Sequence, residues 1–134
     1  MPYSLRYLLL FVAFLCCCAG CRKEAGPGGN AAIRGNVQAY HYNSTFTVFI
    51  ADYPAADEYV YIIYDDDFSY SDRVKTDYEG DFEFKYLNPG QYRIYVYSLD
   101  STLQAPSGSI AVVKDITIEG NKDIVQTDTL KIFK

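Results

Sequence analysis

The sequence has little of what most catalytic and metal-binding sites are built from. Its 134 residues include no tryptophan, one methionine and one histidine, His41. All four cysteines fall in a short early segment, at Cys16, Cys17, Cys18 and Cys21, so the rest of the chain can form neither a disulfide nor a thiolate metal site. A lone histidine at the end of an expected strand has no evident partner for acid–base or metal chemistry. We therefore expect no enzyme, no catalytic residue, no bound metal and no cofactor.

Positive charge is scarce as well. The chain has 12 Lys and Arg residues against 17 Asp and Glu, a net charge of −5. Arg6 lies in a segment that we expect to be removed, which leaves 11 basic against 17 acidic residues. An acidic chain without a basic cluster repels a phosphate backbone, so we expect no nucleic-acid partner.

No apolar run is long enough to cross a membrane. The run from Leu8 to Ala19 has 12 residues, and a spanning helix needs ~20. A short start with one arginine, this apolar run and the small residues after it form a secretory signal pattern. The ending Cys18-Ala19-Gly20-Cys21 resembles the lipobox of bacterial lipoproteins, whose cysteine receives a diacylglycerol before cleavage.

That resemblance implies a signal peptide over 1–20 and a mature protein that begins at Cys21 and is held at the outer membrane by acyl chains such as palmitate. An ordinary secreted protein cut near the same place is the alternative. The next residues, Arg22-Lys23-Glu24, resemble short export signals to the cell surface, and the membrane leaflet stays open. Residues 21–31 are rich in glycine and are expected to be a flexible spacer before a domain over 32–134.

What the sequence has in quantity is tyrosine and phenylalanine, 14 and 8 residues, which favour β-strands. No segment shows a helical period. Two loops rich in acids are expected over 52–58 and 65–72, and Val112-Val113 indicates a bulge or a bend because the alternation changes phase there. Alternating apolar residues predict strands over 33–41, 45–51, 59–64, 73–76, 81–87, 92–98, 110–118 and 124–133.

The clearest pattern runs from Thr76 to Val96. Gly80 can take the positive φ of a turn, and Pro89-Gly90 suits the centre of a type II turn. Side chains alternate along a strand, so Phe82, Phe84 and Tyr86 are expected on one face of the first strand, and Tyr92, Ile94 and Val96 on one face of the next.

A chain that forms strands but no helices can best bury the apolar faces of its strands by packing two sheets against each other. The pattern resembles that of carboxypeptidase regulatory-like domains, and this implies a seven- to eight-stranded, transthyretin-like Greek-key β-sandwich. Collagen-adhesin B-type repeats share the pattern, but their isopeptide bond is not expected here, because the first strand offers Arg34 instead of lysine and the last has no asparagine. The residues that carry the resemblance are Thr76-Asp77, Gly80-Asp81-Phe82, Phe84, Leu87, Pro89-Gly90, Tyr92, Ile94 and Val96.

Two candidate sites remain. Tyr95 and Tyr97, with Tyr40 and Tyr42, are expected to point away from the core, where tyrosines suit a protein interface or a sugar ring. Cross-strand aromatic pairing is the structural alternative. The acids of 65–72 could bind calcium or form a solvated rim. The sequence thus favours a non-catalytic interaction module with an envelope protein or a glycan as its partner.

Overall fold

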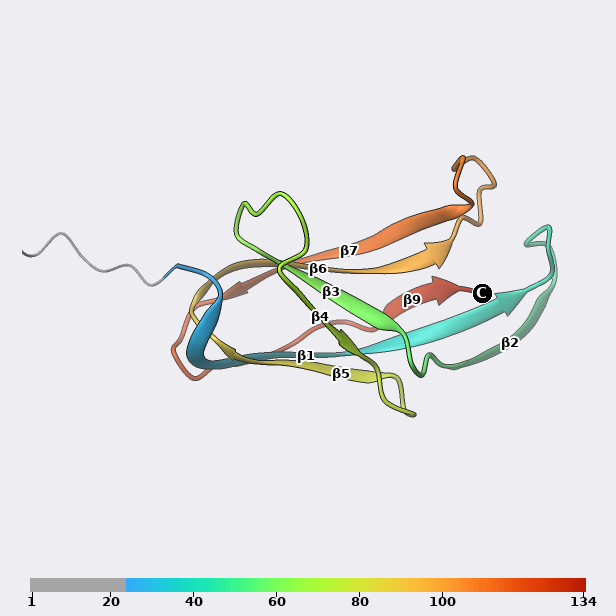
Figure 1. The fold of residues 1–134 in the computed structure, drawn as a ribbon. Helices are drawn as coiled ribbons and strands as arrows, with labels where there is room; N and C mark the ends of the chain where they lie inside the picture. The colour runs from blue at the N-terminus through green and yellow to red at the C-terminus, as the bar shows by residue number, and fades with distance from the viewer. Residues whose placement is uncertain (1–23) are drawn as a thin grey trace, which may run out of the picture.

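The computed structural model describes residues 24–134, and all of their regular structure is β (Figure 1). Two sheets pack face to face, which confirms the predicted all-β sandwich. No helix among these residues is long and apolar enough to cross a membrane. The strands are β1 (Pro27–Tyr42), β2 (Phe49–Pro54), β3 (Tyr59–Tyr64), β4 (Asp72–Lys75), β5 (Asp81–Leu87), β6 (Gly90–Leu99), β7 (Ser109–Ile118), β8 (Ile124–Gln126) and β9 (Leu130–Phe133).

The first sheet is organised around the long strand β1. Strands β2 and β5 pair with β1 antiparallel, and β8 and β9 pair with it in parallel. The second sheet has the order β4-β3-β6-β7, with every pairing antiparallel. The strand at 59–64 was expected to be central, and β3 indeed lies between β4 and β6.

The core lies where the inward side chains of the two sheets meet. Ile33 and Val37 of β1 are fully buried, as are Ile62 of β3 and Ile94 and Val96 of β6. Except for Ala32, which is buried beside Ile33, their neighbours in sequence are exposed or half-buried, as the period of a pleated strand requires. The predicted inward set of β6 is therefore confirmed.

The chain between β4 and β5 forms a corner that joins both sheets. Thr76 is 5% exposed, and its hydroxyl donates to the carbonyl of Ala55 while accepting from the amide of Glu58. The carboxylate of Asp77 accepts the amides of Glu79 and Asp81, each at 2.9 Å. Gly80 has the predicted positive φ, at 79°. Each of these hydrogen bonds satisfies a polar group that a tight turn would otherwise leave unpaired.

Tyr86 was expected to share the inward face of β5 with Phe82 and Phe84. Those two are buried, but Tyr86 is 69% exposed and has a positive φ of 59°. The backbone twist at Tyr86 turns its ring outward, and Leu87 takes the inward position with 2% exposure. The pairing of β5 with β1 is irregular beside this point, which is typical of a bulge.

Pro89-Gly90 does not form the predicted type II turn. Gly90 is the first residue of β6 and pairs with Ile118 in β7. A Cβ on Gly90 would lie 2.7 Å from the Cβ of Ala25, so the glycine makes room for a neighbouring segment. Close approach explains this glycine better than turn geometry does.

The predicted bulge at Val112-Val113 is also wrong. Strand β7 pairs with β6 in one unbroken register from Ser109 to Ile118. The phase changes because Val113 lies on the outer face of the sheet, opposite Tyr95, while Val112 points inward against the core. Apolar side chains therefore occupy both faces of a strand whose pairing is regular throughout.

Two further strands differ from their predicted bounds. The expected strand over 124–133 is divided into β8 and β9, which raises the number of strands to nine. The expected strand over 45–51 begins and ends later, as β2, because Asn43 caps the loop before it with hydrogen bonds to the amides of Thr47 and Val48. The outcome is a loop at 43–48 and a strand that continues to Pro54.

The residues expected to be a spacer, 21–31, are largely part of the fold. Strand β1 begins at Pro27, and Ala31 is fully buried. Glycine suits this segment because the chain runs close to β5, where a Cβ on Gly29 would lie 2.0 Å from the carbonyl oxygen of Leu87. The domain therefore starts before residue 32.

The Asp100 carboxylate stabilises the loop after β6 in a pH-dependent way. It is 3% exposed, and its carboxylate accepts hydrogen bonds from Thr102, Gln104 and Ala105. The hydroxyl of Thr102 and these amides lower the pKa of Asp100 from 3.8 to about 2. Because the folded pKa is depressed, the stabilisation is complete above the unfolded value of 3.8 and is lost as the pH falls through about 2.

We expect Asp100→Asn to flatten that pH dependence. In urea unfolding experiments, the free energy of unfolding of the wild type should fall steeply from pH 4 to pH 2, the interval between the two pKa values. The free energy of unfolding of the variant should fall less over the same interval. Equal slopes for both proteins would mean that Asp100 does not hold the loop through its charge.

Candidate functional site

Five tyrosines gather on the outer face of the four-stranded sheet. Tyr61 and Tyr95 are cross-strand partners whose rings stack at 5.0 Å with an interplanar angle of 10°. Tyr97 meets both of these rings edge to face, at 5.7 Å from Tyr61 and 5.6 Å from Tyr95. Tyr59 and Tyr70 contact Tyr61 at 6.2 and 5.1 Å. We refer to Tyr59, Tyr61, Tyr70, Tyr95 and Tyr97 as the tyrosine face.

Strand β4 adds cations to one side of the tyrosine face. The guanidinium of Arg73 lies 4.3 Å from the ring centroid of Tyr59, and the ammonium of Lys75 lies 5.1 Å from it. A hydrogen bond with Tyr61 raises the pKa of Arg73, and a hydrogen bond with Asp57 raises that of Lys75. Cations over aromatic faces are attracted by the ring quadrupole, so both side chains have a preferred place here.

The tyrosine face is in contact with solvent. Tyr97 is 53% exposed, Tyr70 46% and Tyr59 39%. Val113, which lies opposite Tyr95 in β7, is 46% exposed and extends the apolar surface. Burial among its neighbours raises the pKa of Tyr95, and Tyr97 raises it further. The rings thus combine an ordered centre with accessible margins.

Tyr40 and Tyr42 do not join the tyrosine face. They belong to β1, in the other sheet, so the structure separates them from Tyr95 and Tyr97. The ring of Tyr40 lies under Lys131 of β9, with 5.8 Å between the ammonium and the ring centroid. The four tyrosines proposed as one binding surface are therefore two pairs on different sheets.

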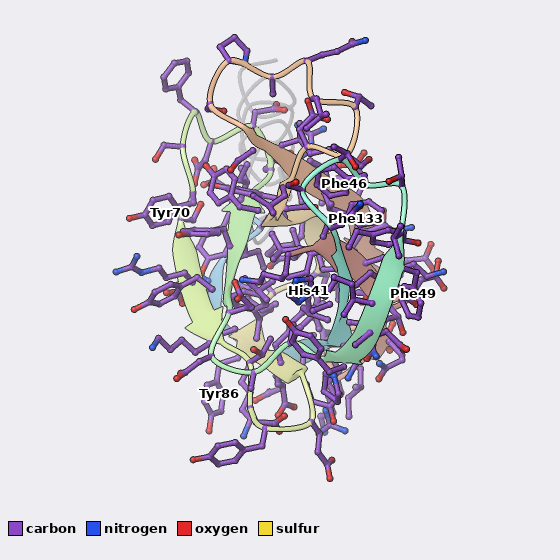
Figure 2. The ribbon with its side chains drawn as sticks, turned by 90° about the vertical axis from the view of Figure 1, so that its right-hand side faces the viewer. His41, Phe46, Phe49, Tyr70, Tyr86 and Phe133 are labelled. Atoms are coloured by element: carbon purple, nitrogen blue, oxygen red, sulfur yellow. The ribbon has the colours of Figure 1, made fainter. Side chains whose placement is uncertain are left out.

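Tyr42 is part of a second aromatic cluster at the end of the sandwich. Its ring contacts Phe46, Phe49 and Phe133 with centroid distances of 6.3, 5.5 and 5.7 Å. Figure 2 shows Phe49 on the opposite side of the molecule from Tyr70, which belongs to the tyrosine face. The two aromatic clusters are thus separate surfaces.

His41 and the acidic loop at 65–72 lie in local contacts of the fold. His41 is exposed at the end of β1 and pairs with Ala51 in β2. In the acidic loop, the carboxylate of Asp67 accepts the hydroxyl of Ser71 at 2.6 Å. No group of three or more His, Cys, Asp or Glu that could hold a metal occurs among residues 24–134. Cys21 lies outside the described residues.

The sequence identified two members of the tyrosine face and missed the others. Tyr59 and Tyr61 had a signal, since they are two residues apart in an expected central strand and so share a face. Their partner strand was needed to place them beside Tyr95. Tyr70 lies in a loop, and Arg73 was expected only as part of a short strand, so neither gave a signal of its own.

No family model and no curated protein matches the chain. Among solved structures it is similar to a candidate carbohydrate binding protein from Pseudomonas aeruginosa, with 17% identity, a TM-score of 0.47 and coverage of 82% of this chain and 92% of that one. It is also similar to a 9R-lipoxygenase from Cyanothece PCC8801, with 17% identity, a TM-score of 0.40 and coverage of 78% and 16%. An (S)-allantoin synthase gives 10% identity, a TM-score of 0.39 and coverage of 78% and 43%. At these scores the similarities indicate nothing about function.

Proposed function

We propose that the protein is a non-catalytic binding module of the outer membrane, held there by acyl chains on Cys21, and that it contacts an envelope partner through the tyrosine face. The observation that carries the proposal is the contact of five exposed or partly exposed tyrosine rings on one sheet. Tyrosine offers a large apolar body with a polar tip at a low cost in side-chain entropy, which suits recognition surfaces.

The composition of this surface supports the proposal. Protein interfaces have an aromatic centre depleted of charge and a polar rim, with tyrosine and arginine enriched at the residues that bind most strongly. Here the rings form the centre, Arg73 and Lys75 lie at one side, and the ion pair of Arg93 with Asp115 lies on the same sheet, with 2.7 Å between its charged atoms. Two of the three cations beside the rings have a carboxylate partner, Lys75 with Asp57 and Arg93 with Asp115, while Arg73 lies over the ring of Tyr59.

We also propose membership in the carboxypeptidase regulatory-like domains. The supporting observations are the corner at Thr76, Asp77 and Gly80, whose side chains and backbone shape the turn, and the inward alternation of β6. The sheet orders with parallel pairing of β1 and β9 support a transthyretin-like topology.

The anchoring is tested on the mature protein from its native membrane. We expect an intact mass that corresponds to a chain starting at Cys21 plus acyl groups, and partition into the detergent phase of a cloud-point extraction. Cys21→Ala should abolish both. An unmodified mass for the wild type would contradict the anchoring.

The binding surface is tested by affinity capture of the full lipidated protein in mild detergent. We expect Tyr97→Ala to lose a specific partner that the wild type retains, because the ring is half exposed at the margin of the face. Tyr78→Ala is the matched control, since Tyr78 is 94% exposed and lies outside the tyrosine face. A partner retained by Tyr97→Ala, or lost equally by both variants, would contradict the proposal.

A glycan is the second candidate partner, and the orientation of Tyr97 favours it. Tyr61 and Tyr95 stack on one another, whereas the ring of Tyr97 is turned by 74° and 83° from them, so neither neighbour is stacked parallel on it. The apolar C–H groups of a pyranose can pack on such a ring while its hydroxyls remain hydrated.

We expect binding on a glycan array to be lost in Tyr97→Ala and weakened in Tyr95→Ala, with circular dichroism unchanged. Tyr78→Ala should bind as the wild type does. Absence of binding by the wild type, or unchanged binding by both face variants, would leave a protein partner as the only candidate of the two.

A further inference from the structure

The first described residues are clamped onto the sandwich by a set of mutual hydrogen bonds. The amide of Gly26 donates to the hydroxyl of Tyr92 at 2.8 Å, and that hydroxyl donates to the carbonyl of Asn88 at 2.6 Å. The amide of Asn88 in turn donates to the carbonyl of Gly26 at 2.8 Å. Tyr92 is 2% exposed, so these bonds form away from water, where an unpaired group would be costly.

Close packing reinforces this clamp, which we define as residues 25–31. Ala25 lies close against Gly90: a Cβ added to Gly90 would come within 2.7 Å of the Cβ of Ala25. The backbone at Gly29 leaves no room for a Cβ beside the carbonyl oxygen of Leu87, and Ala31 is fully buried. The glycines thus permit contact rather than mobility.

The clamp leaves a very short tether. Between Cys21 and Ala25 the chain has only Arg22, Lys23 and Glu24. Four fully extended residue steps span at most about 14 Å. The spacer expected from the sequence, up to residue 31, would have reached more than twice as far.

We propose that the clamp fixes the sandwich end-on beside the lipid surface, with the loop after β3 facing the bilayer and the loops of the β1–β2 and β6–β7 hairpins facing away. This inference rests on the proposed acylation of Cys21. Glu24 and Ala25 line one groove together with Tyr64 and residues 65–67, so the tether leaves the domain beside that loop. Figure 1 shows both hairpin loops at the opposite end of the sandwich from the entry of the chain. The tyrosine face then runs along the side of the domain, with Tyr70 of the loop after β3 at its membrane end and the rings of β3 and β6 open to a partner in the envelope.

The orientation is tested by fluorescence on the full lipidated protein in vesicles of zwitterionic phosphatidylcholine that carry a headgroup quencher, because an anionic surface would repel the acids at 65–67. Asp66→Cys places a dye on the loop after β3, and Ser44→Cys places one on the β1–β2 loop; both positions are exposed. An acylated Cys21 has no free thiol to take the dye. We expect quenching several-fold stronger at position 66 than at position 44.

Releasing the clamp should remove the difference. Tyr92→Phe deletes the hydroxyl that binds Gly26, and an insertion of ten Gly and Ser residues between Glu24 and Ala25 lengthens the tether without touching the fold. Both should bring the two quenching values together, and the insertion covers the case in which Tyr92→Phe unfolds. Equal quenching at both positions in a fully acylated, uninserted protein would overturn the inference. A mass without acyl groups on the same sample would instead refute the proposed anchoring.

Discussion

Replacing Ile94 by alanine should lower the free energy of unfolding by about 2–5 kcal/mol, the usual cost of deleting a buried isoleucine side chain. Ile94 is fully buried in β6, between Ile62 of β3 and Lys114 of β7. The loss combines the transfer energy of the removed methyl and methylene groups with the cavity left between the two sheets. Urea unfolding followed by circular dichroism measures it.

Val113→Ala is the matched control in the neighbouring strand. Val113 is 46% exposed on the outer face, so its truncation should change stability by no more than about 0.5 kcal/mol. If the two substitutions cost the same, the inward and outward faces of this sheet would be wrongly placed.

Replacing Gly80 by alanine should be nearly as damaging. Gly80 has a φ of 79°, and a Cβ there would lie 2.4 Å from the carbonyl oxygen of Val37. That oxygen is backbone and is held by the amide of Ala55, so it cannot move aside cheaply. The left-handed conformation and the overpacking together should cost about 2–5 kcal/mol.

Gly108→Ala separates the two contributions. Gly108 has a similar φ of 72°, but nothing lies within 4 Å of the position of its Cβ. Gly108→Ala should lower the free energy of unfolding only by the conformational cost, about 1–2 kcal/mol. Equal losses in thermal or urea unfolding for both variants would show that the close approach of Gly80 to β1 is not real.

The sequence predicted well wherever one face of a strand is buried and the other wet. The inward sets of β5 and β6 were recognised at Phe82, Phe84 and Ile94 because burial imposes a period of two. The prediction from alternation failed where contacts between strands override the period of two. Tyr86 turns outward because its φ is positive, and Val113 lies on the outer face opposite Tyr95 although it is apolar.

Glycine was the main source of error at the N-terminus. A segment rich in glycine and proline resembles a linker by composition, and only the structure shows that Gly29 lies against the backbone of Leu87 and that Ala25 of this segment packs against Gly90. Composition cannot distinguish a glycine that makes the backbone flexible from one that lets another segment pack closely against it, because both effects come from the absence of a side chain.

The candidate site was predicted in part. Tyr95 and Tyr97 point outward as expected, but the outward tyrosines of β1 lie on the other sheet, since sidedness within a strand says nothing about which sheet the strand joins. Tyr61 became central only through its pairing with Tyr95. Long-range strand order was the missing information.

Photo-crosslinking in living cells shows whether the tyrosine face binds a partner, because it reports what touches these rings in place. A benzophenone amino acid would replace Tyr97 in the full-length protein, and Tyr78 in a parallel strain. We expect a discrete adduct, to a protein or a glycan, from position 97 and none from position 78. No adduct at position 97, or the same adduct from both positions, would contradict binding through the tyrosine face.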